Sequence, residues 1–66
     1  MTIKINDSTL TLSEGASLID ALNVAQITLN GIAVAVNNNV VPAGEYSQTM
    51  LNDGDSVIII KAFYGG

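Results

Sequence analysis

The chain has no cysteine and no histidine among its 66 residues, and this absence limits the ways in which it can fold. A domain of this length buries only about 60% of the surface that its unfolded form exposes. Small domains often compensate with disulfides or a zinc site, and neither can form here from cysteine. The chain therefore depends on one aliphatic core, and its length allows one domain. The same absence excludes cysteine nucleophiles, Ser-His-Asp triads and histidine-ligated metal sites.

Charge and hydropathy narrow the class of protein further. The net charge is −4 with only two lysines, so no basic patch is available for nucleic acid. Apolar residues make up 48% of the chain, which is too many for disorder and predicts either an apolar face that meets a partner or an apolar patch exposed to solvent. No apolar run approaches the roughly 20 residues that span a bilayer. Because Lys4, Asn6 and Asp7 interrupt the segment where a signal peptide has its apolar core, we expect a cytoplasmic protein with no membrane partner.

Alternation of apolar and polar residues predicts the strands. Ile3 and Ile5 share one face of the first strand, and Leu10 and Leu12 share one face of the second. The turn residues between them favour a β-hairpin. The predicted strands cover residues 2–6, 9–12, 32–37, 40–42 and 57–62. The fourth ends at a proline, which suits the edge of a sheet.

A single short helix is expected after the first hairpin. Ser17 and Asp20 have the spacing of a capping box, and the apolar residues that follow Ser17 would form the buried side of about two helical turns. Residues 24–29 lack clean alternation and are interpreted as a loop that turns at Asn30–Gly31. The order of elements predicts an α+β fold, with a four- to five-stranded mixed sheet and one main helix packed on one face. The other face of the sheet is then left open.

The parity of the strands predicts which side chains occupy this open face. Lys61 is expected to point to solvent, so alternation along the last strand turns Ile58 and Ile60 toward the helix. In the third strand the larger valines are expected to fill the core, and the alanines to face outward. The predicted partner-binding face comprises Ala33, Ala35, Val57 and Ile59. The alternative is a scatter of single surface hydrophobes, which is normal for a soluble domain.

Few residues offer reactive chemistry, and we predict no intrinsic catalytic residue and no metal site. Asp53–Gly54–Asp55 lacks the later ligand positions of a calcium loop and is interpreted as a turn. Glu14 and Asp20 have no companion that would complete an acid–base site. The remaining feature is Gly65–Gly66 at the C-terminus, where two residues without Cβ can pass extended through a narrow channel. A frayed end is the alternative interpretation.

The order and spacing of these features resemble the ThiS/MoaD family of ubiquitin-like β-grasp sulfur carriers. The stretches that carry the resemblance are Ala33–Asn37, Val41–Pro42, Asp53–Asp55 and Gly65–Gly66. The length is similar to that of the ThiS-type carriers of thiamine biosynthesis, whereas the MoaD-type carriers of molybdopterin synthesis are usually longer. The resemblance implies a β-grasp domain over residues 1–62 and a flexible C-terminal tail over residues 63–66.

The resemblance also implies a mechanism and partners. A ThiF-like activating enzyme would use ATP to adenylate the carboxylate of Gly66, and a persulfide sulfur donor would convert it to a thiocarboxylate. A ThiG-like thiazole synthase would then take the sulfur into the thiazole of thiamine. Phe63, Tyr64 and Gly65 would thread into the partner, and the chain would be a protein co-substrate without a bound cofactor. The alternatives are a MoaD-like carrier for molybdopterin, a ubiquitin-like protein modifier, and a passive β-grasp binding module.

Overall fold

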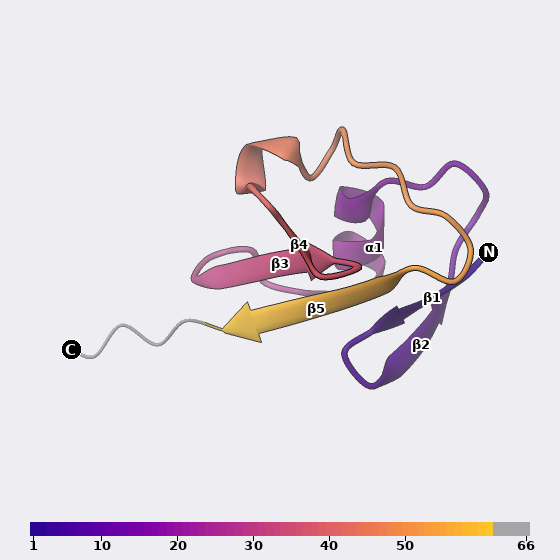
Figure 1. The fold of residues 1–66 in the computed structure, drawn as a ribbon, viewed down its shortest axis with the longest axis horizontal. Helices are drawn as coiled ribbons and strands as arrows, with labels where there is room; N and C mark the ends of the chain where they lie inside the picture. The colour runs from indigo at the N-terminus through magenta and orange to yellow at the C-terminus, as the bar shows by residue number, and fades with distance from the viewer. Residues whose placement is uncertain (62–66) are drawn as a thin grey trace.

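The computed structural model describes residues 1–61, and in this range a five-stranded mixed sheet packs against one α-helix. In chain order the elements are β1 (Thr2–Ile5), β2 (Ser8–Thr11), α1 (Leu18–Val24), β3 (Ile32–Val36), β4 (Asn39–Val41), the 3-10 helix η1 (Ala43–Glu45) and β5 (Ser56–Lys61). The strand order is β2-β1-β5-β3-β4, so that the last strand lies at the centre, parallel to β1 and antiparallel to β3. Figure 1 shows α1 on one side of this sheet, and the predicted α+β class is confirmed.

The core lies between the sheet and α1. Its buried apolar residues are Ile3, Ile5, Leu12, Leu18, Ala21, Leu22, Val34, Tyr46, Leu51, Val57 and Ile59. The inward faces predicted for the first hairpin and the helix are confirmed. Tyr46 and Leu51 come from the segment between β4 and β5, where the sequence shows no periodicity, so this segment contributes core residues that alternation did not indicate.

The start of α1 is capped by side chains of its own first turn and by backbone carbonyls of the segment before β5. The hydroxyl of Ser17 accepts from the amide of Asp20 at 3.3 Å, and the Asp20 carboxylate accepts from the amide of Ser17 at 3.0 Å, which confirms the predicted capping box. The amides of the first two helical residues donate to the backbone carbonyls of Thr49 and Tyr46, at 2.7 and 3.1 Å. The segment before β5 therefore binds the groups that a helix start leaves without partners.

The end of α1 turns the chain back toward the sheet. Gln26 adopts a left-handed conformation with φ of 59°, and its amide donates to the carbonyl of Asn23 at 3.1 Å. The amide of Ile27 donates to the carbonyl of Leu22 at 2.9 Å, which completes a Schellman pairing. The following residues form the predicted loop rather than a strand, and β3 begins after the turn at Asn30–Gly31.

Asparagine side chains shape the turn between β3 and β4. Asn37 and Asn38 have φ of 50° and 71°, so both residues of this two-residue loop are left-handed, as a type I′ hairpin requires. The Asn37 amide group donates to the Asp55 carboxylate and accepts from the amide of Ser56, both at 3.0 Å. This asparagine turn is therefore linked to the start of β5.

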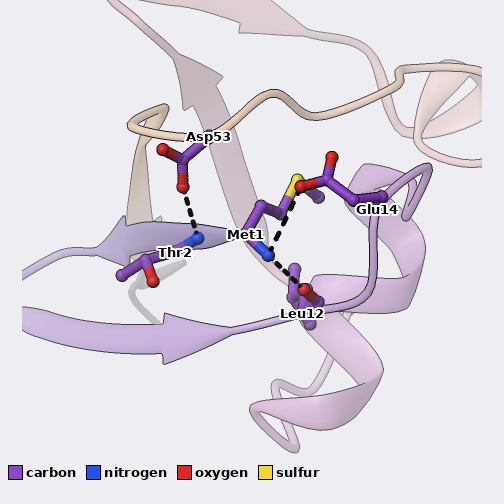
Figure 2. Close-up of polar contacts among 5 residues, drawn as sticks. All are labelled: Met1, Thr2, Leu12, Glu14 and Asp53. Carbon is purple, nitrogen blue, oxygen red and sulfur yellow. Dashed lines mark hydrogen bonds and ion pairs between the residues drawn. The ribbon is translucent and has the colours of Figure 1, made fainter.

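The first residues of the chain are held by two other segments (Figure 2). The N-terminal ammonium of Met1 donates to the carbonyl of Leu12 at 2.6 Å and lies 3.8 Å from the carboxylate of Glu14. The amide of Thr2 donates to the carboxylate of Asp53 at 2.7 Å. These contacts fasten the start of β1 to the end of β2 and to the turn that precedes β5.

The turn at Gly54 gives a test of backbone strain. Gly54 has φ of 88°, and an added Cβ would meet no atom within 4 Å, so any cost of a side chain there comes from the backbone alone. Gly54→Ala is expected to lower the free energy of unfolding by about 1 kcal/mol. Gly44→Ala is the matched control, because it has the same free space without a positive φ and should be neutral or slightly stabilising. Urea unfolding measures both, and equal losses would contradict the strain argument.

Candidate functional site

The outer face of the sheet, opposite α1, carries an apolar patch over β5, β3 and β4. Ala33 and Ala35 lie directly opposite Ile60 and Ile58 in the pairing of β3 with β5, and Val40 of β4 lies opposite Ala35. The side chains of Ile58, Ile60 and Val40 are 37%, 57% and 75% exposed. We call these five residues the outer aliphatic patch. Two of its members lie on β5, the strand that precedes residues 62–66.

The sequence prediction of this face was wrong for the last strand. Val57 and Ile59 are 0% and 8% exposed and belong to the core, while the two isoleucines expected toward the helix are exposed instead. The error came from using Lys61 as the marker of the outer face. Lys61 has the parity of the core residues, but it ends the strand, and a long side chain at that position reaches solvent from either face. Ser56 was the better marker, because it has the parity of the exposed isoleucines.

The other half of the outer face, over β1 and β2, is polar. Alternation places Thr2, Lys4, Thr9 and Thr11 on this side, and all four are exposed. None of the six carboxylates of residues 1–61 lies on a strand; all belong to turns, loops, α1 or η1. The outer face is therefore apolar on one half, hydroxyl-rich on the other, and free of negative charge along its strands.

The far end of β5 borders a shallow pocket. The pocket is lined by Gln26, Ile27, Thr28, Asn30, Gly31, Ile32 and Lys61. It lies where the described part of the chain ends, beside the last residue of β5. Phe63, Tyr64, Gly65 and Gly66, the predicted threading and modification residues, lie outside the described residues.

The polar residues of the described range form no reaction centre. Within residues 1–61 no group of three histidine, cysteine, aspartate or glutamate residues could hold a metal ion. The Asp20 carboxylate accepts the helix-cap bond, and the carboxylates of Asp53 and Asp55 accept from the amides of Thr2 and Asn52 in and around their turn. The helix in this range is not long and apolar enough to cross a membrane.

Comparisons with known proteins agree on one family. The model of the ThiS family matches residues 2–66. The chain is 27% identical to the sulfur carrier protein ThiS of Escherichia coli K12, with both chains covered completely. In fold it is similar to the crystal structure of the thiamine biosynthesis protein ThiS of Geobacter metallireducens, with a TM-score of 0.80 at 23% identity over 100% of this chain and 99% of that one. A solution structure of a thiamine biosynthesis protein from the same organism gives a TM-score of 0.75 and is covered to 88%.

The two faces of β5 can be tested at adjacent isoleucines. Ile59→Asp places an unpaired charge in the core, which costs several kcal/mol, and it should unfold a domain this small. Ile60→Asp changes a side chain that is 57% exposed and should cost about 1 kcal/mol or less. Thermal melts followed by circular dichroism measure both variants. If Ile60→Asp unfolds the protein and Ile59→Asp does not, the assignment of the faces is reversed.

Proposed function

The chain belongs to the ThiS family and is a sulfur carrier of thiamine biosynthesis, and we propose that it carries the sulfur as a thiocarboxylate on Gly66. The observation that supports this proposal is the position of β5. This strand is central in the sheet, carries two members of the outer aliphatic patch and leads into the residues that end in Gly65–Gly66. A carrier is not itself a catalyst, so the chemistry at Gly66 must come from partner enzymes.

The proposed chemistry begins with adenylation by a ThiF-like activating enzyme. A carboxylate oxygen of Gly66 attacks the α-phosphorus of ATP, pyrophosphate leaves, and the acyl carbon becomes electrophilic. The terminal sulfur of a persulfide donor then displaces AMP, and a thiol cleaves the remaining S–S bond to leave the thiocarboxylate. A ThiG-like thiazole synthase takes this sulfur into the thiazole ring. The partner enzyme contributes the orientation that makes each step fast.

The outer aliphatic patch is the proposed docking surface for the activating enzyme or the thiazole synthase. It is exposed and apolar, and no carboxylate lies on the strands that carry it, so a partner can cover it without burying a negative charge. The net charge of −4 would attract the chain to an enzyme with a basic rim around an apolar surface. Docking on β3, β4 and β5 would direct the chain after β5 toward the active site of the same enzyme.

The reaction at Gly66 predicts a change in intact mass. After incubation with the activating enzyme, ATP and a sulfur donor, the protein should gain the mass difference between sulfur and oxygen, and fragmentation should place it on Gly66. A variant that lacks Gly66 is the control and should not change. Absence of the shift, under conditions in which the Escherichia coli relative is converted, would contradict the proposal. Linkage of Gly66 to protein lysines would instead support a protein modifier.

Docking and threading should be separable in one assay of ATP–pyrophosphate exchange with the activating enzyme. Gly65→Val adds a β-branched side chain that stiffens the backbone and widens the segment that must enter the enzyme. It should reduce the exchange rate by about a hundredfold at saturating carrier, because small misplacements of a reacting group cost about that much. Ile60→Asp, on the outer aliphatic patch, should instead raise the carrier concentration needed for half-maximal exchange.

Folding controls keep this result interpretable. Gly65 follows the last described strand, and substitution there should leave the thermal midpoint nearly unchanged, as is usual for terminal residues. A normal exchange rate for Gly65→Val would contradict threading. An unchanged half-maximal concentration for Ile60→Asp would contradict docking of the activating enzyme on the outer aliphatic patch.

A further inference from the structure

The outer edge of β2 carries backbone groups that have no partner in the sheet. The backbone groups of Met1 and Leu12 bond each other in both directions, at 2.6 and 2.8 Å, so the bonded pairs of this antiparallel ladder recur at alternate positions. The amides and carbonyls of Thr9 and Thr11 therefore point away from β1. Within residues 1–61 these groups bond no other segment.

The two edges of the sheet differ in how they are protected. At the far edge, β4 has three residues and is followed by Pro42, and short edges and prolines prevent further strand pairing. β2 has four residues without a proline, and Thr9 and Thr11 have side chains that favour strands. The edge of β2 is therefore open to an added strand.

Hollows between β2 and α1 flank this edge on the helix side. One is lined in part by Leu12, Asn23 and Val24, and another in part by Leu10 and Ile27. Leu12 is buried and Leu10 and Ile27 are half-buried, so these three residues give the hollows an apolar lining. Val24 is 57% exposed although it is aliphatic, and Asn23 adds an exposed amide group. A strand added to β2 would direct every second side chain toward these hollows.

Charge indicates which strand would fit. Asp7 lies in the turn before β2, and Glu14 and Asp20 line one of the hollows beyond its other end. A second copy of the chain, paired antiparallel edge to edge, would bring Asp7 of each copy toward Glu14 of the other. Like charges at both ends oppose such a dimer, whereas basic residues at the two ends of an added strand would be attracted.

We propose that the β2 edge binds an extended segment of a partner protein in which every second residue is aliphatic and a basic residue stands at each end. The segment would bond the amides and carbonyls of Thr9 and Thr11, place its aliphatic side chains in the hollows beside α1, and place its terminal basic residues near Asp7 at one end and near Glu14 and Asp20 at the other. This is strand addition, in which main-chain hydrogen bonds supply affinity and the alternate side chains supply specificity. The site is separate from the outer aliphatic patch and does not depend on the chemistry proposed at Gly66.

A capped synthetic peptide in which valine and serine alternate between a lysine at each end is the probe, and the amide NMR spectrum of the labelled protein is the readout. Binding should shift the resonances of β2 and slow the hydrogen exchange of the Thr9 and Thr11 amides. Thr9→Pro removes one free amide without removing a bond to β1, and it should weaken binding about tenfold or more. Thr9→Val, which keeps the amide, is the matched control and should bind normally.

Two further peptides make the test independent of whether Thr9→Pro folds. A peptide of the same composition and the same terminal lysines with its valines in one block, and an alternating peptide methylated on the amides that would face β2, should each bind at least tenfold more weakly to the unmodified protein. Equal binding of all three peptides would show charge attraction alone and overturn the proposal. Protection of Thr9 and Thr11 that grows with protein concentration and without peptide would identify a second copy as the occupant and also overturn it.

Discussion

The first and last strands of the described fold pair in parallel along only two residue positions, Lys4 with Ser56 and Ile5 with Val57. The chain leaves β1 at the next residue, where Asn6 takes φ of 51° to begin the hairpin turn. The backbone amide of Asn6 still donates to the carbonyl of Val57 at 2.8 Å, and its side-chain oxygen Oδ1 accepts from the amide of Ile59 at 2.8 Å, which extends the pairing by one more bond. This pairing sets the register of β5, and the position of the core and of the outer aliphatic patch depends on that register.

The central place of β5 connects stability with function. Its inward side chains, Val57 and Ile59, lie in the core beneath α1, and its outward side chains, Ile58 and Ile60, are two of the five residues of the outer aliphatic patch. A one-residue slip of β5 would exchange these two sets and expose the core. The same register that stabilises the fold therefore presents the apolar surface on the strand that leads toward Gly66.

The segment between β4 and β5 stabilises the short helix α1. Helix α1 has only seven residues, too few to be stable without tertiary contacts. The carbonyls of Tyr46 and Thr49 bind its first amides, the amide of Leu51 donates to the carbonyl of Ala16 at 3.0 Å, and Tyr46 fills the core beside it. The amides at the start of the helix therefore find their hydrogen-bond acceptors in an irregular segment that is distant in sequence.

Local patterns in the sequence were enough to predict the α+β class, the capping box at Ser17 and the edge position of the strand before Pro42, because alternation, capping and the missing amide of proline depend on single or neighbouring residues. The order of short motifs, ending in Gly65–Gly66, was enough to indicate the family. The faces of β5 and the core role of Tyr46 depended on the tertiary structure. An almost continuous apolar run such as residues 57–60 has no alternation of its own, so only pairing with β1 and β3 decides which side chains face the helix. Tyr46 lies in a segment without periodicity, and its burial follows from the path of that segment across α1.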